Sequence, residues 1–330
     1  MNVLIWRLHR NQAYVAGAAL AALTCLLLLT GIAMAHDYRA FLASCQTTRS
    51  CGDAARLFRG DSAITTLVDA TMAVPILLGL FWGAPLLARE LEAGTHNLAW
   101  TQGVTRRSWL SRNVLWALAA AAVWGAATAA LVTWWRGPQN AIAVLVAQPD
   151  GSGVPVRLAT FTFDLQGIAP AAYSVFAVAL GIAAGSIFKR VLPAMAVTVT
   201  AFAGLRFLIA EYARPRYLTA ITSVRPAYSG WVPPAGSWIR SYASLVGPNG
   251  VDYTNTPIIS YQDTPAACRA IPQQYNRFGS CLSSHGFHTL ITYQPASRFW
   301  AFQGIEAGIF IVLAAALVAV AYRTVLTRDA

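Results

Sequence analysis

The sequence has few charged residues and only one lysine, Lys189. Charged residues make up 11% of the chain, whereas soluble domains carry roughly a quarter, so this chain cannot cover a large water-facing surface. Lys189 lies between Phe188 and Arg190, so the Gly-Lys-Ser/Thr segment that holds nucleotide phosphates is absent. A His-Glu-x-x-His zinc motif and a Gly-x-Ser-x-Gly nucleophile elbow are absent too. We therefore predict that the chain is not itself an enzyme.

Long apolar runs take the place of charge. Hydrophobic residues make up 56% of the chain, and helical runs of about 20 apolar residues match the thickness of a bilayer. The first run could instead be a signal peptide, since Ala33-Met34-Ala35 resembles a cleavage site, but its apolar stretch exceeds the usual length of roughly 7–15 residues. The runs predict an all-α polytopic membrane protein with six transmembrane helices, at about 13–34, 64–87, 113–135, 168–188, 191–210 and 299–322.

The remaining segments predict three parts. Residues 1–210 hold a short interfacial helix over 1–12 and the first five spans. Residues 211–298 contain 8 of the 12 tyrosines and 9 of the 16 prolines, which favours a small, loop-rich, partly β extracellular domain over long helices. Residues 299–330 are the sixth span and a short tail. A β-hairpin is predicted where 141–147 and 154–163 flank an Asp150-Gly151 turn.

The distribution of basic residues sets the orientation. The net charge of +11 could indicate a nucleic-acid partner, but the charges are scattered over loops between spans, which favours contact with anionic lipid headgroups instead. If the N-terminus is cytoplasmic, the short cytoplasmic segments contain about twice as many basic residues per unit length as the segments on the opposite side. The positive-inside rule requires this excess. Both termini are therefore predicted to be cytoplasmic. The basic residues of these segments are Arg7, Arg10, Arg89, Arg106, Arg107, Arg112, Lys189, Arg190, Arg323 and Arg328.

Four of the five cysteines fall in the predicted outside loops, as the pairs Cys45/Cys51 and Cys268/Cys281. Cys25 lies inside the first span. Pairs in an oxidising compartment predict two disulfides, with four free thiols as the alternative. His285 and His288 nearby could seat a metal, but no carboxylate accompanies them, and surface histidines are the plainer interpretation.

The loop between the second and third spans carries a distinctive motif. It contains Glu90-x-Glu92-x-Gly94-Thr95, and Thr105-Arg106 precedes the next span. Thr95 to Gln102 can form two helical turns between glycines, and Thr105 is a plausible N-cap. A short crosswise helix of this kind can seat a membrane bundle on a soluble partner. The alternative is a tight basic turn between two spans.

This motif resembles that of the permeases of ABC-2-type ABC transporters. Two segments, 87–96 and 293–300, are similar to a group of such permeases from actinobacteria, and the six-span topology agrees along the whole chain. The large outside region before the sixth span departs from many of these permeases, so substrates of short-looped relatives do not transfer. By this resemblance the loop over 89–107 couples to an ATPase. The residues it assigns, together with two neighbours, are Glu90, Glu92, Gly94, Thr95, His96 and Arg106.

The resemblance implies a permease subunit of an ATP-driven exporter in the bacterial plasma membrane. A separate ATPase subunit would bind ATP and Mg²⁺, and this chain would hold no cofactor. Six spans are half of the usual transmembrane unit, so a second copy or a related permease is implied. Substrates of the wider family include drugs, antibiotics, peptides and lipids. The alternative is a membrane-anchored enzyme or sensor acting through the extracellular domain. A secondary transporter is disfavoured, because the sequence does not show two repeated halves that each contain an interrupted transmembrane helix.

Three ionisable residues lie within the predicted spans: Asp69, Arg206 and Glu306. At 1.5 Å per residue all three are roughly 6–10 Å below the outer surface. Because charges in lipid pair or line a cavity, we hypothesise one polar cluster at the outer mouth of a translocation path; separate pairing or snorkelling is the alternative. Gly-x-x-x-Gly spacings occur at 79/83, 181/185 and 304/308 and predict close helix packing.

Overall fold

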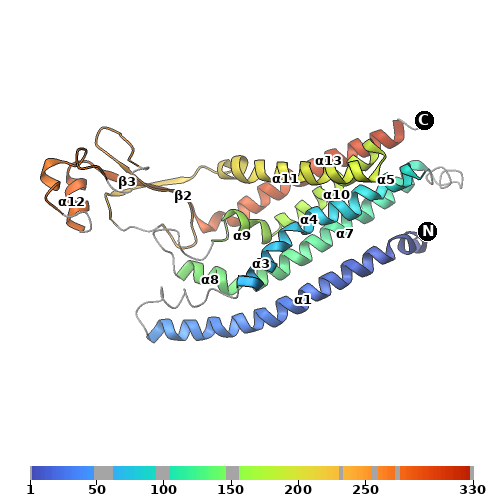
Figure 1. Cartoon of the computed structure of the whole chain (residues 1–330), viewed down its shortest axis with the longest axis horizontal. Helices are drawn as coiled ribbons and strands as arrows, with labels where there is room; N and C mark the ends of the chain where they lie inside the picture. Colours follow the sequence, from blue (N-terminus) through green and yellow to red (C-terminus); the bar gives the residue numbers. More distant parts are fainter. Residues whose placement is uncertain are drawn as a thin grey trace. The chain divides into compact units, whose positions relative to one another are not determined.

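The computed structural model describes residues 2–47, 62–93, 105–145, 156–229, 233–253, 259–271 and 276–327. The chain divides into two compact units. Unit 1 comprises Met1–Pro138, Thr160–Tyr217 and Trp300–Ala330; unit 2 comprises Gln139–Ala159 and Leu218–Phe299. Within the described residues, six helices are long and apolar enough to cross a membrane (Figure 1). A small region with strands lies in sequence between the fifth and sixth, and the predicted fold class is confirmed.

The first two spans differ in regularity. Helix α1 (Asn2–Thr47) is continuous, so the segment predicted as a separate interfacial helix belongs to it. Trp135 Nε1 donates a hydrogen bond to Thr30 Oγ1 of α1 at 2.9 Å. The second span changes its helical pitch where prolines interrupt the hydrogen-bond ladder. It consists of α3 (Ser62–Ala70), the 3₁₀ turn η1 (Thr71–Ala73), α4 (Val74–Leu78), the π turn η2 (Gly79–Gly83) and α5 (Ala84–Glu92).

The other four spans lie near their predicted positions. Helix α7 (Arg106–Trp135) begins at the predicted cap, where Thr105 Oγ1 accepts a hydrogen bond from the Ser108 amide at 3.3 Å. Helices α10 (Ala169–Phe188) and α11 (Val191–Leu208) follow. A π turn, η3 (Ile209–Ala213), and a 3₁₀ turn, η4 (Arg214–Arg216), extend the fifth span six residues beyond its predicted end. Helix α13 (Phe299–Thr327) is the sixth.

Helix α10 is the centre of unit 1. In its most apolar 18-residue stretch, 72% of the residues are buried, whereas the corresponding share is 28% or less in each other span. Glycines allow the second span to approach it: a Cβ on Gly181 would lie 2.5 Å from the Gly79 oxygen, and one on Gly83 would lie 2.6 Å from the Val178 oxygen. The glycines at 79/83 and 181/185 therefore pack within the chain, whereas Gly304 faces open space.

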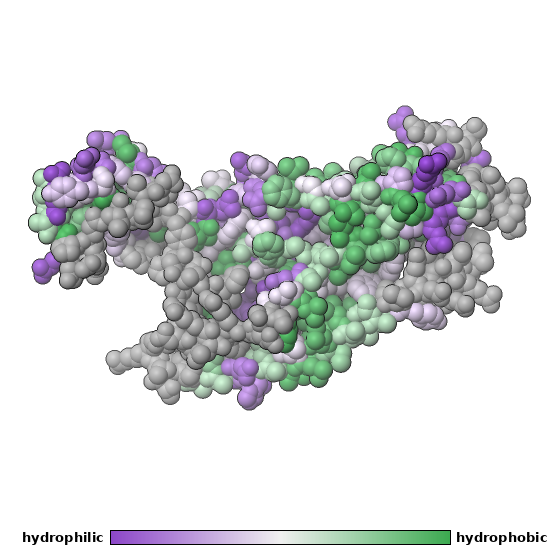
Figure 2. Space-filling model, viewed as in Figure 1, coloured by the Kyte–Doolittle hydropathy of each residue, from purple (hydrophilic) through white to green (hydrophobic). Residues whose placement is uncertain are grey.

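Many exposed side chains on the helices are apolar. Hydrophobic side chains gather over the helical part of the molecule (Figure 2). Leu29, Leu115, Leu192 and Val312 are between 68% and 79% exposed. Such exposure would be unfavourable in water and suits contact with lipid.

Unit 2 contains a three-stranded antiparallel sheet in the order β1-β3-β2. Its strands are β1 (Ile221–Pro226), β2 (Trp238–Val246) and β3 (His288–Gln294). Helix α12 (Asn276–Ser284) and the 3₁₀ turns η5 (Ala266–Cys268) and η6 (Ala296–Arg298) accompany them. A separate hydrophobic core surrounds Leu245, Phe278 and Phe287.

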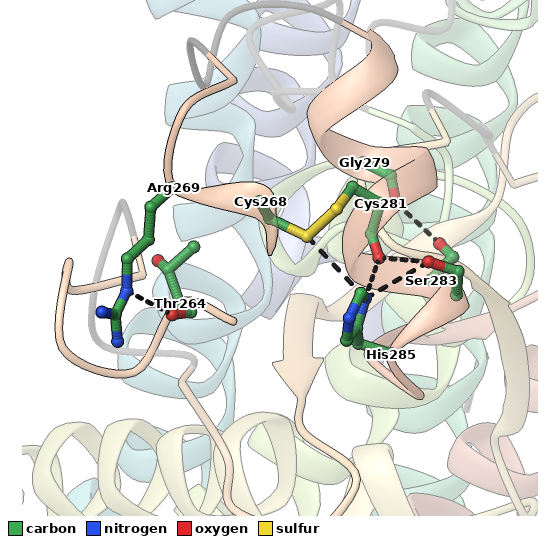
Figure 3. The surroundings of a disulfide bond; sticks show 8 residues. Thr264, Cys268, Arg269, Gly279, Cys281, Ser283 and His285 are labelled. Carbon is green, nitrogen blue, oxygen red and sulfur yellow. Dashed lines mark hydrogen bonds between the residues drawn. A yellow bond between two sulfur atoms is a disulfide. The ribbon is translucent and has the colours of Figure 1, made fainter. Parts of the chain in front are cut away.

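The predicted Cys268–Cys281 disulfide is present and joins η5 to α12 (Figure 3). His285 Nδ1 lies 2.9 Å from the Cys281 carbonyl oxygen and 3.8 Å from Cys268 Sγ. The disulfide occupies both sulfur atoms, so this grouping does not supply a thiolate metal site. The other predicted pair, Cys45 and Cys51, lies outside the described side chains.

The hairpin prediction was wrong in its described parts. Helix α8 (Gly137–Leu145) covers most of the first predicted strand, and α9 (Thr160–Leu165) begins within the last four residues of the second. Short apolar runs fit a helix or a strand equally well by pattern alone. Pro138 in the first turn of α8 is well placed to start a helix, where its missing N–H loses no bond.

Candidate functional site

Four charged side chains meet inside unit 1, and we call them the ionic cluster: Asp164 of α9, Arg206 of α11, Arg214 of η4 and Glu306 of α13. Each side chain is at most 12% exposed. Two carboxylates and two guanidinium groups balance to zero formal charge. Burial of four charges is stable only when each is paired and hydrogen-bonded.

Arg214 is the best-paired member of the cluster. Its Nε donates to Glu306 Oε2 at 2.8 Å, and its Nη2 lies 2.6 Å from Glu306 Oε1 and 2.5 Å from Asp164 Oδ1. Arg206 Nη2 lies 2.5 Å from Asp164 Oδ2, and its Nη1 lies 3.5 Å from Glu306 Oε1. The paired contact of one guanidinium with both oxygens of Glu306 fixes orientation as well as charge.

Two tyrosines complete the shell around Glu306. Tyr173 donates to Glu306 Oε1 at 2.5 Å, and Tyr217 donates to Oε2 at 3.2 Å. Burial raises the pKa of Tyr217, and the neighbouring Glu306 carboxylate raises it further, so its hydroxyl remains a donor. Arg206 also stacks over the Tyr173 ring, 3.8 Å from its centroid. Burial raises the pKa of Asp164, while Arg206 and Arg214 act in the opposite direction.

Gln303 ties α13 to the helix junction beside the ionic cluster. Its Oε1 accepts from the Ala169 amide at 2.8 Å, and its Nε2 donates to the Phe163 carbonyl at 3.1 Å. Gln303 thus caps the start of α10 and the end of α9 together, which satisfies backbone groups that a helix end leaves unpaired. Gly167, at φ +77°, permits the tight turn between them; a Cβ there would lie 2.7 Å from Gln303.

The structure places the three predicted intramembrane charges at two locations. Arg206 and Glu306 meet in the ionic cluster. Asp69 forms an ion pair with Arg136 instead, and its side chain is 46% exposed. Sequence reasoning assigned Asp164 and Arg214 to outside segments and so missed them as members of the cluster.

The predicted coupling loop is described at its two ends. Glu90 and Glu92 lie in the last turn of α5, and Arg106 begins α7. Glu92 Oε2 accepts a hydrogen bond from the Val191 amide at 3.1 Å, which links the end of α5 to the start of α11. Gly94, Thr95 and His96 lie outside the described residues.

Six helices that are long and apolar enough to cross a membrane define a multi-pass membrane protein. Residues 17–214 match the family described as ABC-2 membrane transporter related. The chain belongs to this family and is a transmembrane transporter subunit. The matched region includes Glu92, Arg206 and Arg214, whereas α13 with Glu306 follows it. No curated protein and no solved structure gave a match.

Proposed function

We propose that the chain is the permease subunit of an ATP-driven exporter that works with a separate ATPase subunit. The family match carries this proposal, because it spans the second and third transmembrane segments together with the loop that joins them. The partner would bind ATP and Mg²⁺, since no nucleotide-phosphate motif occurs in this sequence. A drug, antibiotic, peptide or lipid is the class of cargo that the family resemblance suggests.

In this proposal both termini and the loop over 88–112 face the cytoplasm, and unit 2 faces outward. The basic residues of the short segments support this orientation. The disulfide of unit 2 supports it independently, because disulfides persist in oxidising compartments. Two permease subunits, identical or related, would form the complete transmembrane part with two ATPases.

Reconstitution tests the proposal. The tagged chain is purified from its native membrane and analysed for a co-purifying subunit with a Walker A motif, and the complex is assayed for ATP hydrolysis in lipid vesicles. We expect vanadate-sensitive hydrolysis that is lost when the Walker A lysine of that partner is substituted. A chain that purifies without such a subunit and remains active without nucleotide would overturn the proposal.

The alternative function is a membrane-anchored enzyme or sensor acting through unit 2. The observation favouring it is that unit 2 has its own hydrophobic core and a disulfide. Deletion of unit 2 separates the two proposals. An exporter would retain ATPase coupling at its cytoplasmic loop, whereas a sensor or enzyme would lose every activity.

A further inference from the structure

Glu92 is the last residue of α5, and its carboxylate holds the start of α11. A two-residue turn, Lys189–Arg190, joins α10 to α11, and Arg190 supplies no side-chain hydrogen bond to the new helix. Glu92 Oε2 instead accepts from the Val191 amide at 3.1 Å. The first amides of a helix are unpaired and carry partial positive charge. A carboxylate from another helix therefore caps the first amide of α11 in place of the side chain of Arg190, its N-cap residue.

Close packing behind this hydrogen bond joins α5 to α10 and α11. A Cβ on Gly185 would lie 2.8 Å from the Ala84 oxygen and 3.2 Å from the Ala88 nitrogen. Ala88 and Ala194 are fully buried in the same small cluster. Backbone that approaches this closely leaves no room for α5 to slide without moving its neighbours.

Helix α11 is held at both of its ends. Val191 is bonded to Glu92, and Arg206 is paired with Asp164 and Glu306 in the ionic cluster. These two attachment points lie fifteen residues apart in one helix, or roughly 22 Å along its axis at 1.5 Å per residue. A rigid helix fixed at both ends transmits a displacement of one end to the other.

We propose that Glu92 is a positioning residue that passes movement of the coupling loop to α11, and through α11 to the ionic cluster. The inference rests on the proposed function, in which an ATPase acts on this loop. The loop leaves α5 directly after Glu92, so a push on the loop displaces this residue first. The Val191 hydrogen bond and the close packing make α11 follow.

Hydrogen exchange on the intact chain in lipid nanodiscs tests the contact. Glu92→Ala removes the acceptor, and loss of an N-cap of ordinary strength should raise the exchange rate of the Val191 amide roughly fivefold to tenfold. Glu92→Gln keeps an acceptor oxygen and should retain most of the protection. The matched control is Thr105→Ala, which removes the cap of the Ser108 amide at the other end of the same loop. This control should leave the exchange rate of the Val191 amide unchanged. Equal exchange rates of this amide in the wild type and in Glu92→Ala would overturn the inference.

The coupling role is tested on the complex with its ATPase subunit. ATP and vanadate should change exchange in both α7 and α11 of the wild type. In Glu92→Ala the change should persist at the start of α7 and disappear from α11, and Glu92→Gln should restore it. An unaltered α11 response in Glu92→Ala overturns the coupling role. If ATP and vanadate change hydrogen exchange nowhere in the wild-type complex, both the proposed function and the coupling role are overturned. The exchange rates of the Val191 amide still decide whether Glu92 caps α11.

Discussion

Substitution of Glu306 in the ionic cluster should strongly destabilise the helical unit. Glu306→Leu leaves Arg214 without its bidentate partner and gives the cluster a net positive charge in the buried interior of unit 1. Removing one member of a buried pair typically costs about 3–5 kcal/mol, because the remaining charge is uncompensated. We expect a loss of this size in the free energy of unfolding, measured by reversible denaturation of the purified chain in mixed micelles.

A double substitution makes the reasoning quantitative. Arg214→Met alone should also lose about 3–5 kcal/mol, but Glu306→Leu with Arg214→Met leaves Asp164 and Arg206 as a balanced pair. The loss in the double variant should therefore fall at least about 2 kcal/mol below the sum of the single losses, within the range of coupling seen for residues in contact. Asp37→Asn is the control, since this residue belongs to an exposed pair with His36 and should change stability by about 0.5 kcal/mol or less. The cluster would not be a coupled, charge-balanced unit if the losses in the free energy of unfolding were additive. A loss in either single variant as small as that of the control would refute it as well.

Substitutions at three other contacts give further tests. Gly181→Leu should prevent folding or lower the thermal midpoint sharply, because the new side chain would collide with the backbone of the second span. Gly304→Leu is the control and should be tolerated, because this position faces open space. Size-exclusion profiles and thermal unfolding compare the two variants. Replacing Cys268 and Cys281 by serine should destabilise unit 2 by about 3 kcal/mol in the loop-entropy model. Proteolysis of this unit in the intact protein should then be roughly a hundredfold faster. An unchanged proteolysis rate would show that the disulfide does not stabilise unit 2. Gln303→Leu should lower the stability of unit 1 by about 1–3 kcal/mol, since it removes the acceptor of the buried Ala169 amide and one of the hydrogen bonds to the Phe163 carbonyl. A thermal midpoint equal to that of the wild type would contradict this.

The sequence predicted the six spans because their physical basis is local. A bilayer requires about 20 apolar residues in one helix, and that requirement is visible without knowledge of any contact. The N-cap at Thr105 was predictable for the same reason, since a cap involves only neighbouring residues. The pairing of Cys268 with Cys281 needed only the rule that cysteine pairs in an oxidising compartment form disulfides.

The membership of the ionic cluster was not predictable from hydropathy. Asp164 lies in a short helix outside the apolar runs, and Arg214 lies beyond the apolar part of the fifth span. The π turn η3 contributes to the meeting of the arginines. Eight α-helical residues would put Arg214 about 80° around the axis from Arg206, and the extra residue of a π turn reduces this offset. A sequence pattern that assumes a regular helix therefore places the two arginines about 80° apart around the helix axis.

The role of Glu92 as a cap was hidden for a related reason. The family resemblance assigns this residue to a predicted coupling loop, but its hydrogen-bond partner is a backbone amide 99 residues away. Backbone groups carry no signature in a sequence. Depth in the membrane alone groups Asp69 with Arg206 and Glu306, but the Asp69 side chain points to Arg136.

The position of Glu306 in the chain has a consequence for biosynthesis. It follows Arg214 by 92 residues, so the helix that carries it emerges after the whole of the intervening segment. At about 5–20 residues per second, the two arginines spend roughly 5–20 seconds in the membrane with Asp164 as the only carboxylate of the cluster yet made. The nascent bundle is therefore incomplete and positively charged until α13 inserts. Insertion of that helix is the step that brings the formal charge of the cluster to zero.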